Sequence, residues 1–181
     1  MKLYRFSPIL TTELLYKAIK HIHIQSHILC MNSFGKYLPN SGNMGVFCHY
    51  DKEFDYLKQI QATLCKPSDN PNQKYFELLS PILVSENENI PETTYTHLYI
   101  RRSDPYRHHV GDIDFYVEIE KYTKLKVEMV NGKVVKDARI FDRTDLDMIE
   151  LYNPDIDVLA YVSTNQMTQN VRIKQSEVTK L

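Results

Sequence analysis

The chain has 181 residues, of which 43% are hydrophobic and 25% are charged, and its formal net charge is -1. This is the composition of an ordinary globular domain, which is long enough to fold without a disulfide or a metal. The near-neutral charge excludes a general polyanion-binding function, and no segment reaches the ~18 apolar residues of a membrane span. We therefore expect neither extended DNA nor a membrane as a partner.

The first part of the chain alternates strand and helix patterns. Residues 2–7 predict a short first strand, because polar and apolar side chains alternate there. A long helix is predicted over residues 12–34, with Thr11 as its N-cap and apolar residues at three- and four-residue spacing. Residues 44–50 predict a buried strand, and Asp51 is placed to cap a second helix.

The middle of the chain is rich in strand-forming residues. Residues 76–84 are interrupted by Pro81, which predicts a helical turn followed by a short strand at 82–84. Residues 93–102 and 111–119 both predict strands. Because only a short polar connection separates these two segments, we expect them to pair directly as antiparallel neighbours.

The last third of the chain contains an ambiguous segment. Residues 120–141 fit a hairpin with its turn at Asn131-Gly132, but they also fit a helix that the same glycine ends. We favour a helix followed by a strand over 138–141. A capping-box pattern predicts a short helix over 144–152, and residues 157–163 predict a final buried strand.

These elements predict a single α+β domain over residues 1–163. A mixed, mostly antiparallel sheet would pack against the long N-terminal helix and two or three shorter helices. We expect four representative side chains in the core, namely Ile22, Val46, Phe115 and Leu159. Residues 164–181 form a polar tail with little core material.

The three cysteines, Cys30, Cys48 and Cys65, are odd in number and widely spaced. This pattern argues against a disulfide framework, so free thiols are expected, with Cys30 and Cys48 buried. The N-terminus lacks the apolar stretch of a signal peptide. Together these features favour a cytoplasmic location.

Histidines supply the candidate catalytic groups. His23 and His27 stand four residues apart on the long helix, a spacing that can bring two imidazoles to one metal ion. We favour instead a position at the edge of the core, and we expect no metal and no other cofactor. His49 ends a strand directly before a helix, where sites often form, and is the best acid–base candidate, with His27 as its helper.

A short loop supplies the candidate anion-binding groups. Three arginines, two histidines and a tyrosine fall within residues 101–109. The guanidinium group presents a planar fork of donors that matches the oxygens of a phosphate. We therefore predict phosphate binding by Arg101, Arg102 and Arg107, against the alternative that the loop is a solvated basic turn.

Carboxylates cluster on the strand predicted over residues 111–119. The two-residue period of a strand places Asp112, Asp114, Tyr116 and Glu118 on one face. Clustered carboxylates can bind Mg²⁺, but no calcium-loop spacing occurs here. We expect these residues to form a solvated face of the sheet.

The pattern as a whole favours a small enzyme or binding domain that acts on a phosphorylated ligand, such as a nucleotide or an RNA end, through histidine and arginine. The nucleotide-binding motifs GxxxxGK[ST] and GxGxxG are absent from the sequence. The alternative is a non-catalytic domain that binds a protein partner. The first function needs the histidines and arginines to converge in one pocket, whereas the second needs an exposed apolar patch.

Overall fold

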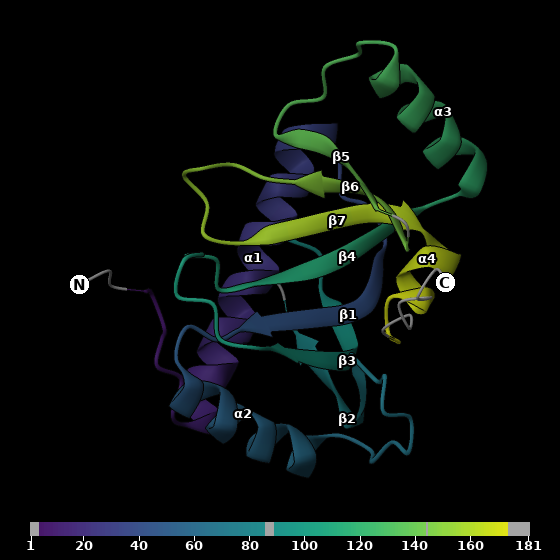
Figure 1. Cartoon of the computed structure of the whole chain (residues 1–181). Helices are drawn as coiled ribbons and strands as arrows, with labels where there is room; N and C mark the ends of the chain where they lie inside the picture. Colours follow the sequence, from purple (N-terminus) through teal and green to yellow (C-terminus); the bar gives the residue numbers. More distant parts are fainter. Residues whose placement is uncertain (1–3, 86–88, 144, 174–181) are drawn as a thin grey trace, which may run out of the picture.

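A seven-stranded mixed sheet organises the chain in the computed structural model, which describes residues 4–85, 89–143 and 145–173 (Figure 1). The strands lie in the order β2-β3-β1-β4-β7-β6-β5, with β1 parallel to β3, β4 parallel to β7, and the other neighbours antiparallel. Their bounds are β1 Asn40–Phe47, β2 Phe76–Val84, β3 Thr93–Arg101, β4 Gly111–Val117, β5 Ala138–Arg143, β6 Leu146–Leu151 and β7 Leu159–Thr164. The predicted α+β fold with a mostly antiparallel sheet is confirmed.

Within the described residues, four helices accompany the sheet, namely α1 Thr12–Phe34, α2 Asp51–Leu64, α3 Ile119–Val130 and α4 Asn165–Asn170. The long helix has the predicted bounds: the Thr11 side chain accepts a hydrogen bond from the Leu14 backbone N–H, and Gly35 ends the helix in the left-handed region at φ 66°. In Figure 1, α1 runs behind the sheet and α3 stands at its β5 end. The predicted second helix is α2, and the ambiguous segment forms α3 followed by β5, as favoured.

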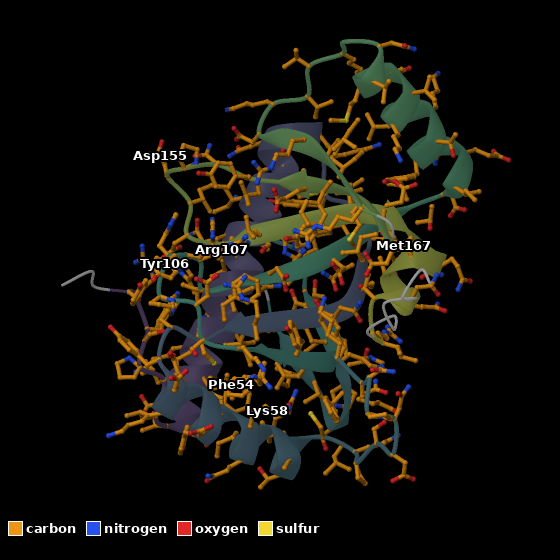
Figure 2. All side chains as sticks on the ribbon, viewed as in Figure 1. Phe54, Lys58, Tyr106, Arg107, Asp155 and Met167 are labelled. Atoms are coloured by element: carbon orange, nitrogen blue, oxygen red, sulfur yellow. The ribbon has the colours of Figure 1, made fainter. Side chains whose placement is uncertain are left out.

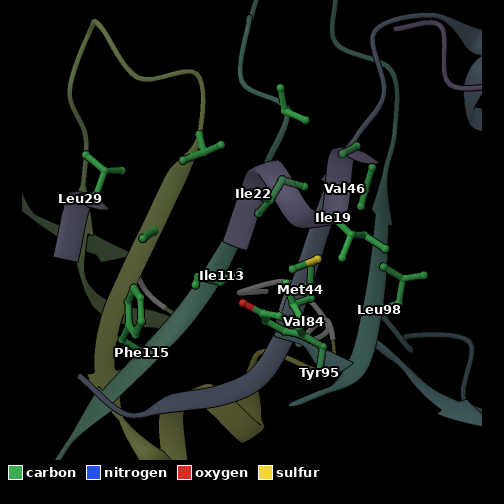
Figure 3. Close-up of a cluster of buried hydrophobic side chains, with 14 of the residues drawn as sticks. Ile19, Ile22, Leu29, Met44, Val46, Val84, Tyr95, Leu98, Ile113 and Phe115 are labelled. Atoms are coloured by element: carbon green, nitrogen blue, oxygen red, sulfur yellow. The ribbon is translucent and has the colours of Figure 1, made fainter. Parts of the chain in front are cut away.

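The apolar core fills the space between α1 and one face of the sheet (Figure 3). Even-numbered residues of β1 and odd-numbered residues of β4 point to this face, where Val46, Ile113 and Phe115 are buried. Ile22 of α1 is buried there as well, and Leu159 is buried on the opposite face, where it pairs with Asp112, so the predicted burial of all four side chains is confirmed. The three cysteines are buried free thiols, as expected.

The opposite face of the sheet, which we call the polar face, is only partly covered. Helix α4 contacts the sheet there, and Lys74 and Tyr75 donate backbone hydrogen bonds to the Arg172 carbonyl. A small apolar cluster of Tyr75, Met148 and Val171 lies beneath this cover. The polar face thus has a floor of sheet residues and a partial roof at the α4 end.

One strand pairing was predicted wrongly. Strands β3 and β4 are not neighbours, because β1 lies between them and Gly45 pairs with Tyr99 on one side and Asp112 on the other. The connection between β3 and β4 crosses the end of β1: the Asp104 N–H bonds to the Cys48 carbonyl. Sequence separation alone therefore did not indicate the neighbours of either strand.

Two segments that were predicted to be wholly or partly helical are strands. The segment predicted as a short helix is β6, in which Met148 and Glu150 face one side and Ile149 and Leu151 the other, while Thr144 lies outside the described residues. Pro81 does not interrupt β2, because β2 is an edge strand whose register shifts around the proline.

The predicted first strand is wrong for residues 4–7, and residues 2 and 3 lie outside the described part. The segment forms no ladder because its side chains contact the end of β1 instead: Tyr4 stacks on His49 and Ser7 bonds to Glu53. At the other end, residues 165–173 of the predicted tail form α4 and the turn that packs on the polar face. No helix among the described residues is long and apolar enough to span a membrane.

The close approach of α1 to the sheet depends on Gly111, which generates a stability prediction. A Cβ at this position would lie 2.2 Å from the Gly45 carbonyl oxygen and 2.5 Å from Ile22 Cδ1. We expect Gly111→Ala to lower the free energy of unfolding by about 3 kcal/mol, because backbone atoms cannot move aside cheaply. Urea unfolding measures the change, with Ser80→Ala on the exposed edge strand as control. An unchanged midpoint for Gly111→Ala would contradict the packing described.

Candidate functional site

A hollow of about 190 Å³ opens on the polar face. We call it the polar hollow. It lies between the loop that carries Arg107 and the α4 end of the sheet, where Figure 2 labels Met167. Its lining combines basic, acidic and aromatic side chains: Phe47, Lys74, Tyr75, Tyr99, Arg101, Arg107, Asp112, Asp114, Phe141, Arg143, Leu146, Met148, Tyr161 and Val171. Most of these residues come from the strands beneath and from the segment before β2.

Two carboxylates form the floor of the polar hollow. Asp112 and Asp114 are 7% and 2% exposed, because the two-residue period of β4 directs both toward the polar face. Asn43 donates a hydrogen bond of 2.8 Å to Asp114 Oδ2. The Oδ1 atom of Asp112 is buried and makes no hydrogen bond to any described residue, although the Gly45 backbone lies close to it. The expectation of a solvated acidic face is therefore wrong for these two residues.

Gly45 provides the space that the Asp112 carboxylate occupies. The two residues are register partners on β1 and β4, and a Cβ on Gly45 would lie 2.1 Å from Asp112 Oδ1. A glycine without a positive φ in a central strand otherwise weakens the strand, since it has no side chain to pack. Its presence here is explained by the close approach of a charged group.

Burial disfavours the charged form of both carboxylates. It raises the pKa of Asp112, and the charges of Lys74 and Arg101 oppose that rise. Burial, followed by repulsion from Asp112, raises the pKa of Asp114 to about 7, although the Asn43 hydrogen bond opposes this. The pair can therefore hold or release a proton near neutral pH, which is what a general acid or base requires.

Arg101 and Arg107 form the cationic wall of the polar hollow. Both guanidinium groups reach Asp104, at 3.6 and 3.5 Å. The Arg101 guanidinium also lies over the Phe47 ring, 3.6 Å from its centroid. Its Nη2 atom is buried and makes no hydrogen bond to any described residue. Lys74 adds a further positive charge from the roof, 5.0 Å from the centroid of the Tyr99 ring.

His49 is placed differently from the predicted arginines. It does not line the polar hollow but lies under Tyr4, with stacked ring centroids 3.8 Å apart. Ser7 donates to Glu53 Oε1 at 2.7 Å, so its hydroxyl is the acceptor for His49 Nδ1–H at 2.5 Å. Burial lowers the pKa of His49, although Glu53 opposes this. The described contacts of this imidazole hold the N-terminal segment against α2.

The remaining predicted residues also lie away from the polar hollow. His27 is buried in the core, where its Nδ1–H donates to the His23 carbonyl at 2.8 Å. Arg102 extends to the other side of the sheet, 5.9 Å from the centroid of the Phe54 ring on α2. The structure thus brings Arg101 and Arg107 together but separates them from His27 and Arg102. No group of three His, Cys, Asp or Glu side chains in the described part of the chain is placed to hold a metal ion.

Sequence reasoning missed several residues of the polar hollow. Asp112 and Asp114 were assigned to one face, but the segments that cover that face lie far away in the sequence. Neither Lys74 nor Arg143 was singled out. The available signal was the alternation of the two aspartates with Ile113 and Phe115 in one short strand.

Comparisons with known proteins relate the chain to others through its fold. No protein family model matches the chain, and no curated protein sequence matches it. A solved structure titled "Structural Genomics, Protein EC4020" superposes with a TM-score of 0.51 at 11% identity, covering 90% of this chain and 92% of that one. This likeness establishes a shared α+β fold. Two structures of variants of the Streptomyces coelicolor methylmalonyl-CoA epimerase, in complex with 2-nitronate-propionyl-CoA, give TM-scores of 0.29 and 0.28 at 12% identity, over 70% of this chain and 98% of those chains.

The raised pKa of Asp114 generates a prediction on stability and pH. Between its unfolded value of about 4 and its folded value of about 7, only the folded state keeps the proton. Its contribution to stability therefore falls as the pH rises through this range. We expect Asp114→Asn to raise the melting temperature by several degrees at pH 8, and by much less at pH 4.5.

The control for this experiment is Asp55→Asn on the exposed surface of α2, which removes the same charge. Its effect on the melting temperature should be small and similar at both pH values. A gain for Asp114→Asn that does not depend on pH would contradict the described environment of the carboxylate pair.

Proposed function

We propose that this protein is a binding domain or enzyme for a small phosphorylated ligand of the nucleotide class, and that the ligand binds in the polar hollow. Arg101 and Arg107 would contact the phosphate, and Lys74 would add charge from the roof. Asp112 and Asp114 would accept hydrogen bonds from ligand hydroxyl groups, as carboxylates do with ribose in other nucleotide sites.

One observation carries the proposal: two oppositely charged groups with unused hydrogen-bonding atoms line the same hollow. Asp112 Oδ1 and Arg101 Nη2 are both buried and make no hydrogen bond to a described residue. Arg101 Nη2 has only a long ion pair with Asp104 Oδ2, at 3.6 Å, and Asp112 Oδ1 lies against the Gly45 backbone. An unsatisfied buried polar atom costs about 1–3 kcal/mol, so proteins keep such atoms mainly where they have a function. A ligand with an anionic end and a hydroxyl-bearing end would satisfy both atoms at once.

The aromatic lining supports a nucleotide over a simple anion. Tyr99 and Phe141 present ring surface to the polar hollow, on which a sugar or a base can pack. The predicted catalytic roles of His49 and His27 stay predictions, and so does phosphate binding by Arg102. Within the polar hollow, the carboxylate pair is the acid–base candidate, because Asp114 has a pKa of about 7.

A second candidate function, a domain that binds a protein partner, is favoured by the surface of α3. Ile119, Val127 and Val130 are exposed on this helix, and Tyr122 is its only buried residue. Such a surface is typical of interaction sites. This alternative gains support if the ligand experiments below fail.

The proposal predicts that a phosphorylated compound stabilises the protein through Arg101 and Arg107. A thermal-shift screen of nucleoside monophosphates, sugar phosphates and inorganic phosphate should raise the melting temperature with at least one compound. In the double variant Arg101→Ala/Arg107→Ala the affinity, measured by calorimetry, should fall about 100-fold or more. Each charge-assisted hydrogen bond contributes roughly 1.5–3 kcal/mol, and 1.4 kcal/mol is a factor of ten.

Arg102→Ala is the matched control, since this arginine belongs to the same loop but points to the other side of the sheet. The affinity of the Arg102→Ala variant for the compound found in the screen should stay within a factor of two or so of the wild type. A large loss of affinity would instead support phosphate binding by Arg102. Urea unfolding of each variant shows whether the fold is intact. The proposal fails if no phosphorylated compound shifts the wild type, or if the double variant responds equally.

A further inference from the structure

A second hollow adjoins the polar hollow. It measures about 630 Å³, and we call it the outer hollow. The loop over residues 106–109 forms one side and β5 forms the other. Arg107, Phe141 and Arg143 line both hollows, so the two lie side by side and one ligand can occupy both.

The outer hollow contains a buried imidazole with unused hydrogen-bonding atoms. His109 is 8% exposed, and neither of its ring nitrogens makes a hydrogen bond to a described residue. Burial lowers the pKa of His109 to about 4, with the charges of His108 and Arg101 adding to the effect. At neutral pH the ring therefore offers one donor and one acceptor, the pattern that the edge of a nucleobase complements.

The other side chains of the outer hollow favour a nucleic-acid ligand. Its aromatic and imidazole rings include His108, stacked on His109 at 4.4 Å, and Tyr106, which is 90% exposed. Arg107, Arg139 and Arg143 provide positive charge. Glu150, the single carboxylate among the described lining residues, is already bonded to Arg139 and Tyr161. Bases of single-stranded RNA stack on such rings and on guanidinium planes, and their phosphates pair with arginine.

We propose that the outer hollow binds the second nucleotide of a single-stranded RNA whose terminal phosphate lies in the polar hollow. This inference rests on the proposed function and adds to it the identity of the ligand as an RNA end. The basic patch is local, and the net charge of the chain is -1. The protein can therefore hold a terminus without binding polyanions in general.

The test compares mononucleotides with short RNA. Calorimetry measures the affinities of AMP and UMP and of four-nucleotide oligoadenylate and oligouridylate, each with a 5′- or a 3′-phosphate, at one salt concentration. At least one oligonucleotide should bind ten times more tightly than its mononucleotide. Tyr106→Ala should weaken that oligonucleotide about tenfold or more through lost stacking and should leave the mononucleotide unchanged. Tyr16→Ala, at an exposed tyrosine on α1, is the control and should change neither affinity.

The outcomes separate this inference from the proposal beneath it. Equal affinity for mononucleotide and oligonucleotide, or an equal effect of Tyr106→Ala on both, overturns the outer-hollow inference and leaves the polar hollow as a nucleotide site. Failure of every phosphorylated compound to bind the wild type overturns both. Because Tyr106 is exposed, the variant should fold, and its urea midpoint confirms this.

Discussion

The middle strand β4 faces two opposite environments at once, and the rest of the molecule is arranged around that constraint. Its odd-numbered residues supply Ile113 and Phe115 to the core under α1, while its even-numbered residues supply Asp112 and Asp114 to the polar face. A strand at the edge of a sheet could leave such carboxylates in water. Because β4 has three strands on each side, the aspartates are buried by their neighbours, and those neighbours have to accommodate them.

The neighbouring strands and the α4 end of the chain accommodate the two carboxylates in distinct ways. On β1, Gly45 makes space for Asp112 and Asn43 donates to Asp114, while Arg172 donates in turn to Asn43 Oδ1 at 2.9 Å. The surrounding positive charges lower the pKa of each carboxylate but do not cancel the effect of burial. A fold selected for stability alone would replace such a pair with apolar residues. The free-energy cost of burying two carboxylates at one hollow is therefore better explained by function than by folding.

Periodicity predicted the elements of the fold more reliably than it predicted their neighbours. The helix over 12–34 and the strand pattern of β4 follow from side-chain spacing alone, because each is a local property. The pairing of β1 between β3 and β4 depends on a connection that crosses a strand end, and no local pattern encodes it. Segment 144–152 shows the same limit: its helix-start signal was overridden by pairing with β5 and β7 on either side.

The site was predictable in part for the same physical reason. Arg101 and Arg107 stand close together in the sequence, so their convergence follows from one short loop. The covering of Asp112 and Asp114 depends on Lys74 and on the turn after α4, which are tens of residues away in opposite directions, so only the folded chain reveals that they are buried.

Under the proposed function, that covering would also determine which ligands the polar hollow discriminates. A bare anion that pairs with Arg101 would leave the buried Asp112 carboxyl group without a donor and would be repelled by it in its ionised form, because both groups line one small hollow. A ligand that carries a phosphate at one end and hydroxyl donors at the other would meet each charge with its complement. The buried aspartates would thus exclude the abundant simple anions of the cell by repulsion, while the arginines supply attraction, and specificity arises from the difference between the two.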